Sequence, residues 1–144
     1  MNEYVFDASV IGKWMLPAER EELHIEARDW AARYDRGELT IIVPDLLWIE
    51  VASLLWKAVR KSRITKDEAK MAIVGLRERE LTTVESTPGL LDVALEIALT
   101  HDTSVYDSIY VALAKEMRTI LITADRKLAN AVAGSYAVRW LGSL

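Results

Sequence analysis

No cysteine occurs in this 144-residue chain. Its absence excludes disulfides, thiolate zinc ligands and cysteine nucleophiles. A chain without cysteine suits a reducing compartment, and we expect a cytoplasmic protein. The first residues, MNEYVFDAS, contain neither the basic region nor the long apolar region of a secretory signal peptide.

Long hydrophobic runs are also absent. The apolar stretch DLLWIEVASLLW is interrupted by Glu50, and no segment reaches the roughly 20 residues that cross a membrane. We therefore expect no contact with a membrane. Apolar residues still make up 51% of the chain, which is too many for a disordered protein and enough for one core. We expect a single domain over residues 1–144.

Positive charge is in short supply. The chain has 18 Lys and Arg residues against 22 Asp and Glu residues, which leaves a net charge of −4. Because contacts to phosphates need Lys and Arg, this balance argues against a protein that coats DNA or RNA passively. It leaves open an enzyme that neutralises phosphates with metal ions.

Short apolar segments alternate with longer segments of helical periodicity. The expected strands cover residues 3–8, 39–43, 81–86, 119–123 and 136–141. The expected helices cover residues 17–36, 46–62, 65–79, 87–101, 104–117 and 125–133. This alternation predicts one α/β domain with a central parallel sheet of about five strands and helices on both faces.

Several expected helices begin at residues that are typical helix caps. Asp45 is expected to cap the helix that follows it. The residues TKDE at 65–68 form a capping box, and Pro88 is expected at the first helical position of its helix.

Two acids follow directly on expected strands. Asp7 ends the first strand in VFDAS, and Asp125 follows TILIT. In parallel α/β sheets, ligands bind beyond the carboxyl ends of the strands, so both acids point to one edge of the sheet. Taken alone, each acid is also explained as a helix N-cap.

Glu50 lies about a turn and a half into its helix, which is too deep for a cap. One interpretation is an exposed polar stripe, because Ser53, Lys57 and Lys61 fall within roughly 60° of Glu50 on the helical wheel. The same stripe could line a groove with an acid at one end and two lysines at the other. The sequence does not decide between these interpretations.

Asp107 raises a similar question in the segment SVYDSIYVALAKE. Burying a carboxylate costs several kcal/mol unless it is paired, hydrogen-bonded or bound to a metal. The alternative is a capping box that joins Ser104 and Asp107 in the first helical turn.

A cluster of carboxylates would need cations to stay ionised. Two carboxylates about 4 Å apart repel by on the order of 4 kcal/mol at an effective dielectric constant of 20. Oxygen ligands select hard ions such as Mg²⁺ or Mn²⁺. Two such ions about 3.5–4 Å apart can activate a water and stabilise the leaving oxygen of a phosphodiester.

Four segments of the chain resemble the motifs of PIN-domain ribonucleases, and most closely those of the VapC-type toxins of toxin–antitoxin pairs. They are VFDAS, PDLLWIEVASLLWKA, SVYDSIYVALAKE and LITADRKLA, and the likeness runs from Tyr4 to about residue 133. It implies a PIN-like fold in which Asp7, Glu50, Asp107 and Asp125 hold one or two Mg²⁺ or Mn²⁺ ions.

The resemblance also implies a reaction and partners. The reaction is cleavage of single-stranded RNA by metal-activated water, which leaves a 5′-phosphate and a 3′-hydroxyl. Ser9 and Thr123 match hydroxyl positions of the family and are interpreted as supports that orient the ligands. A cognate antitoxin and a homodimer are implied as partners.

Basic residues follow two of the acids along the chain. Lys57 and Lys61 follow Glu50, and Arg126 follows Asp125. A solvated surface is the simpler interpretation of such residues. Contact with an RNA backbone is the second, and it makes these three residues candidates for binding the substrate.

Other acidic α/β proteins fit less well. A haloacid-dehalogenase-type phosphatase needs a second Asp where this chain has Ser9, and a response-regulator receiver needs an acidic pair where residues 6–8 are Phe-Asp-Ala. A nicotinamide-binding fold would show G-x-G-x-x-G after the first strand, whereas DASVIGKW has one glycine. One alternative is not an enzyme: an interaction module that binds a protein partner and whose acids mainly hold a metal.

Overall fold

The computed structural model describes residues 2–18 and 22–143. Within them, five strands form one sheet in the order β3-β2-β1-β4-β5. Each pair of neighbouring strands is parallel, which confirms the expected sheet. The strands are β1 (Asn2–Phe6), β2 (Leu39–Pro44), β3 (Thr82–Val84), β4 (Ile120–Thr123) and β5 (Val138–Trp140).

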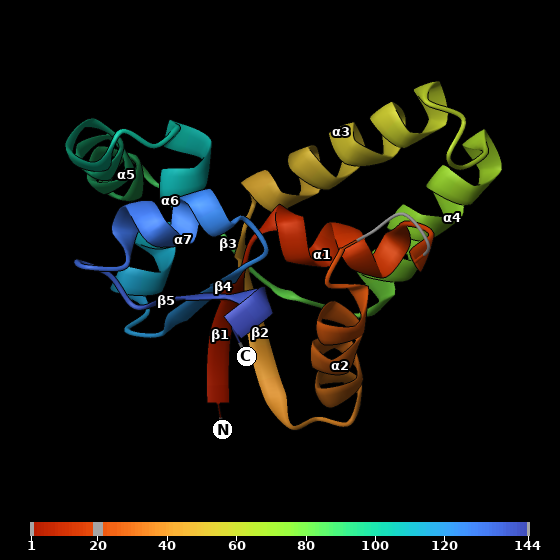
Figure 1. The fold of residues 1–144 in the computed structure, drawn as a ribbon, viewed down its shortest axis with the longest axis horizontal. Coiled ribbons are helices and arrows are strands. Elements are labelled where there is room, and N and C mark those ends of the chain that lie inside the picture. Colours follow the sequence, from red (N-terminus) through yellow and green to blue (C-terminus); the bar gives the residue numbers. More distant parts are fainter. Residues whose placement is uncertain (1, 19–21, 144) are drawn as a thin grey trace.

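Helices flank this sheet. Figure 1 shows α5 and α6 grouped on one side of the sheet, with α1 and α2 on the other, while α3 and α4 form a hairpin that extends outwards. The α-helices of the described residues are α1 (Ala8–Met15), α2 (His24–Asp35), α3 (Leu46–Arg60), α4 (Lys66–Glu78), α5 (Pro88–His101), α6 (Val105–Glu116) and α7 (Arg126–Val132). In the part of the chain described here, no helix combines the length and the apolar character that crossing a membrane requires.

The first helix of the structure is absent from the sequence-based expectation. The strand predicted over 3–8 ends at Phe6, because the Asp7 carboxylate caps α1 by accepting from the backbone N–H groups of Ser9 and Val10. The helix predicted over 17–36 starts only at His24. The preceding residue, Leu23, has a left-handed backbone conformation and is the N-cap residue of α2. Part of the predicted range, residues 19–21, lies outside the described residues.

Asp45 occupies the N-cap position of α3, as the sequence predicts, but its side chain does not cap the helix. Asp45 has a helical backbone conformation and makes no capping hydrogen bond with its side chain. The pairing of β3 with β2 brings Ser86 across from Asp45, and the carboxylate accepts from the Ser86 Oγ at 2.6 Å and from the Ser86 N–H at 3.2 Å. The expected capping box of Thr65 and Glu68 is present at the start of α4.

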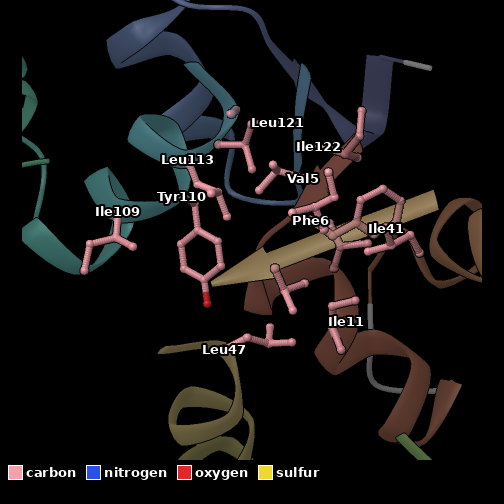
Figure 2. Packing of buried hydrophobic residues seen from close by; sticks show 14 of the residues in the cluster. Val5, Phe6, Ile11, Ile41, Leu47, Ile109, Tyr110, Leu113, Leu121 and Ile122 are labelled. Atoms are coloured by element: carbon pink, nitrogen blue, oxygen red, sulfur yellow. The ribbon is translucent and has the colours of Figure 1, made fainter. Parts of the chain in front are cut away.

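The core explains why α6 has so few polar residues. Every residue from Ser108 to Ala114 is buried, since α6 packs against β1, β2 and β4 on one side and against α5 on the other. Figure 2 shows Tyr110 and Leu113 of this helix among side chains of the sheet, with Leu47 of α3 below them. Asp107 therefore lies where the buried part of α6 begins.

Candidate active site

Asp7 is the most buried acid of the candidate site, with 4% of its surface exposed. It directly follows β1, and both of its carboxylate oxygens accept hydrogen bonds from hydroxyl groups. Ser9 Oγ donates to Oδ1 at 2.5 Å, and Thr123 Oγ1 donates to Oδ2 at 2.5 Å. The end of β1 and the end of β4 thus meet at this carboxylate.

The same two hydroxyl groups also hold the turn that follows β4. Ser9 Oγ accepts from the Ala124 N–H at 2.9 Å, and Thr123 Oγ1 accepts from the Asp125 N–H at 3.0 Å. Asp125 then caps α7 by accepting from the Leu128 N–H at 3.2 Å. Asp125 is thereby held on the same edge of the sheet as Asp7.

Glu50 and Asp107 come from two helices that meet beside this edge. The Tyr110 hydroxyl of α6 donates to Glu50 Oε1 of α3 at 2.6 Å. Asp107 precedes Tyr110 by three residues, so the two side chains lie on one face of α6. Ser104 caps α6 by accepting from the Asp107 N–H at 3.0 Å. The capping interpretation and the site interpretation of Asp107 are therefore compatible.

Tyr110 is the residue of this site that sequence reasoning missed. It stands in the apolar run IYVALA, where a tyrosine counts as a core residue, and its side chain is indeed 1% exposed. The available signal was its spacing of one helical turn from Asp107, together with a hydroxyl group that a buried tyrosine must satisfy.

The acids of the site influence one another electrostatically. Burial, with a smaller contribution from the charge of Asp107, raises the pKa of the Asp7 carboxyl from 3.8 to about 6. The hydrogen bonds from Ser9 and Thr123 favour the ionised form and oppose this rise. Burial also raises the pKa of Glu50, against the hydrogen bond from Tyr110 and with a contribution from Asp107.

Asp107 is the member that links the others. Burial raises its pKa above the ordinary value, the Ser104 side chain opposes this, and the negative charge of Asp125 adds to it. Asp107 thus interacts with Asp7, Glu50 and Asp125, each from a different part of the fold. Repulsion among close carboxylates is the condition under which a cation binds favourably.

The donor set fits a hard divalent ion in its chemistry. All four acids offer carboxylate oxygens, which suit Mg²⁺ and Mn²⁺, and neither cysteine nor histidine lies among them. Within residues 2–18 and 22–143, however, no three Asp, Glu or His side chains already stand together as a set that could hold a metal ion. The fit is therefore one of chemistry and electrostatics.

A cleft of about 510 Å³ is lined by one of the four acids, Glu50. Glu50 and Ser9 lie at its lining together with Lys57 and Lys61, whereas Arg126 lies elsewhere, with its guanidinium 4.8 Å from the centre of the Trp140 ring. The polar stripe of α3 thus faces a cleft with an acid at one end and lysines further along.

Comparison with known proteins agrees with this architecture. Residues 4–133 match the PIN domain family. The chain is 38% identical to ribonuclease VapC3 of Pyrobaculum aerophilum over 127 residues, which cover 88% of this chain and 92% of that protein. The chain belongs to the PIN domain family.

Solved structures show the same fold. The protein PAE2754 from Pyrobaculum aerophilum superimposes with a TM-score of 0.69 at 24% identity, covering 95% of this chain and 83% of that one. A toxin–antitoxin complex from Klebsiella pneumoniae contains a chain that superimposes with a TM-score of 0.64 at 16% identity, covering 96% and 97%.

Proposed function

We propose that this chain is a metal-dependent endoribonuclease that cleaves single-stranded RNA and serves as the toxin of a type II toxin–antitoxin pair. The observation that carries the proposal is a hydrogen-bond network at the carboxyl edge of the sheet. Thr123 Oγ1 joins the Asp7 carboxylate to the backbone of Asp125. Tyr110, one helical turn from Asp107, donates to Glu50, which lines a cleft together with lysines. Membership of the PIN family and the likeness to ribonuclease VapC3 support the activity.

Each group of residues has its own proposed role. The four acids hold Mg²⁺ or Mn²⁺, while Ser9 and Thr123 keep the Asp7 carboxylate in one orientation through their hydrogen bonds. When bound, the metal would supply Lewis acidity at the phosphodiester and would make water more acidic and easier to deprotonate for attack. Lys57 and Lys61 line the cleft and bind the phosphates of the strand.

The test is cleavage of a mixed pool of labelled single-stranded RNAs by the purified protein, in Mg²⁺, in Mn²⁺ and in EDTA. We expect cleavage in both metals, products that end in a 5′-phosphate, and loss of cleavage in EDTA that is restored when Mn²⁺ is added back. Cleavage that continues in EDTA would contradict the metal-dependent mechanism.

The partners are proposed from the relatives. A chain of the same fold occurs in a toxin–antitoxin complex from Klebsiella pneumoniae, and on this ground we propose an antitoxin partner. From the resemblance of the four motifs to the family we also propose a homodimer, with residues 1–144 as the nuclease domain. We propose a place in the cytoplasm, which the lack of cysteine favours. The second candidate function is an interaction module without efficient catalysis. An RNA pool left intact at all metal concentrations, together with tight binding of an antitoxin, would favour that function.

The cleft lysines should control the salt dependence of RNA binding. Replacing both Lys57 and Lys61 by Ala should weaken RNA binding and make its salt dependence shallower. The negative slope of log K against log salt should shrink in magnitude by about 1.4, or about 0.7 for each lost phosphate contact. Fluorescence anisotropy in EDTA, with no cleavage, measures this at several salt concentrations. A slope equal to that of the wild type would contradict the proposed path of the strand.

A matched control uses two other lysines. Lys66 and Lys70 line a separate apolar groove between α3 and α4, so replacing both by Ala changes the net charge equally. We expect this variant to keep the slope of the wild type. An equal loss in both variants would indicate a general effect of charge, with no role for the cleft itself.

A further inference from the structure

A single hydrogen bond joins the buried core of the molecule to one of the candidate metal ligands. Tyr110 is among the largest fully buried side chains, and its hydroxyl group donates to Glu50 Oε1 at 2.6 Å. Figure 2 shows the Tyr110 ring extending from α6 towards α3, with core side chains around it and its oxygen at the far end. Glu50 itself is only half-buried.

The two partners differ in their freedom to move. The Tyr110 ring has two side-chain torsions and is held by close packing, so its oxygen has a nearly fixed position. Glu50 has three torsions on a half-exposed helix face and would otherwise occupy several rotamers. The hydrogen bond from the fixed Tyr110 hydroxyl therefore restricts the rotamers of the Glu50 side chain.

The bond also leaves one oxygen of Glu50 available. Oε1 accepts from Tyr110, while no hydrogen bond to Oε2 is found in the part of the chain that the structure describes. A charge-assisted bond to one oxygen of a carboxylate fixes the orientation of the other. Hydrogen bonds of this kind to a ligand are how proteins orient metal-binding side chains.

We propose that Tyr110 is a positioning residue, which holds Glu50 in the orientation in which it binds the metal ion. The inference rests on the proposed metal site and deepens it. A merely structural role for Tyr110 would require only that its own hydroxyl group be satisfied, and its removal would then leave the metal affinity unchanged.

The test compares wild type and Tyr110→Phe by direct titration with Mn²⁺, followed by electron paramagnetic resonance. We expect Tyr110→Phe to bind Mn²⁺ about 10- to 100-fold more weakly, in the range typical when a partner of a metal ligand is removed. RNA cleavage by the variant should need correspondingly more Mn²⁺, and added Mn²⁺ should raise it again, because all four acids remain.

Tyr34→Phe is the matched control. It removes a tyrosine hydroxyl whose hydrogen bond, at 2.5 Å, goes to the backbone oxygen of Arg79. We expect this variant to bind Mn²⁺ like the wild type. Tyr110→Met provides a second way to remove the hydroxyl group, because methionine adapts to an irregular core if phenylalanine does not fold there.

The outcomes separate two failures. A wild-type protein that binds no Mn²⁺ overturns the proposed metal site, and the positioning role with it. A wild-type protein that binds Mn²⁺, beside a folded Tyr110→Phe protein with the same affinity, overturns the positioning role alone. An equal loss of affinity in Tyr110→Phe and Tyr34→Phe also overturns it, since a general loosening of the fold would then be the cause.

Discussion

Replacing Asp107 by Asn should lower the rate of RNA cleavage by on the order of 10²- to 10³-fold, the range seen when one group that stabilises transition-state charge is removed. Asp107 is the acid through which the others interact, since it raises the pKa of both Asp7 and Glu50 and is itself affected by Asp125. The amide keeps the shape of the side chain, but it removes the charge that attracts a cation.

The fold should survive this change. The hydrogen bond that starts α6 runs from the Asp107 backbone N–H to Ser104 Oγ and does not depend on the carboxylate. Loss of the charge also relieves repulsion from three other acids, so the metal-free variant should be at least as stable as the metal-free wild type. Thermal melting in EDTA compares the stabilities of the two metal-free proteins. Melting in Mn²⁺ then shows which of them binds the metal, because the wild type should gain stability and Asp107→Asn should not.

Asp102→Asn is the matched control for this prediction. Asp102 follows α5 with a φ of 54°, a left-handed conformation that Asn also adopts readily, so the variant loses the same charge a few residues away. It should cleave RNA like the wild type. Full cleavage by Asp107→Asn would mean that the acid cluster is not the catalytic site or that another nuclease is present.

Most of the sheet could be predicted from the sequence, because its three central strands, β2, β1 and β4, contain short apolar runs that end at a polar or turn residue. The parallel arrangement followed from the alternation with helices. The helix over Ala8–Met15 could not be predicted in the same way, since no turn separates it from β1. Asp7 alone stands between the strand and the helix, and it is also the cap of the helix. A pattern of hydrophobicity does not show where one element ends and the next begins without a turn.

The candidate site was foreseeable in its acids but not in its contacts. Strand-end positions drew attention to Asp7 and Asp125, and a polar residue within an apolar run drew attention to Glu50 and Asp107. The Tyr110–Glu50 hydrogen bond joins residues 60 positions apart, and local spacing contains no information on such a pair. The Asp45 carboxylate bonds to Ser86 instead of capping α3, and this contact was equally hidden, because Ser86 reaches Asp45 only through the pairing of β3 with β2.

Replacing Asp7 by Asn should remove a loss of stability that the metal-free wild type shows as the pH rises from about 4 to about 6. Burial raises the pKa of Asp7 from 3.8 to about 6, so the folded chain binds this proton more tightly than the unfolded chain. The resulting contribution to stability is fully present below pH 3.8, declines as the pH rises through the folded pKa of about 6, and is absent above it.

The size of this effect follows from the shift. A rise from 3.8 to about 6 corresponds to on the order of 3 kcal/mol in the free energy of unfolding. The difference in stability between Asp7→Asn and wild type should therefore widen by that amount, in favour of the variant, between pH 4 and pH 7. Urea unfolding in EDTA at several pH values measures it, and parallel curves for the two proteins would contradict the prediction.

Asp45→Asn is the control for the sign of this pH dependence, because the pKa of Asp45 is shifted in the opposite direction to that of Asp7. The hydrogen bonds from Ser86 lower the pKa of Asp45, so its contribution to stability is present at neutral pH and is lost as the pH falls through the lowered folded pKa. The stability difference between this variant and the wild type should change with pH in the opposite direction to that of Asp7→Asn.

A divalent metal should offset the loss of stability at rising pH in the wild type, but not in Asp7→Asn. A bound cation requires the Asp7 carboxylate in its ionised form, so the stabilisation by Mn²⁺ should grow as the pH rises from about 4 to about 7 and should reach about 2.7 kcal/mol at a hundred times the dissociation constant. In Asp7→Asn the stabilisation by Mn²⁺ should be largely lost. The carboxylate that destabilises the metal-free fold at neutral pH would then be the same group that gives the metal its affinity.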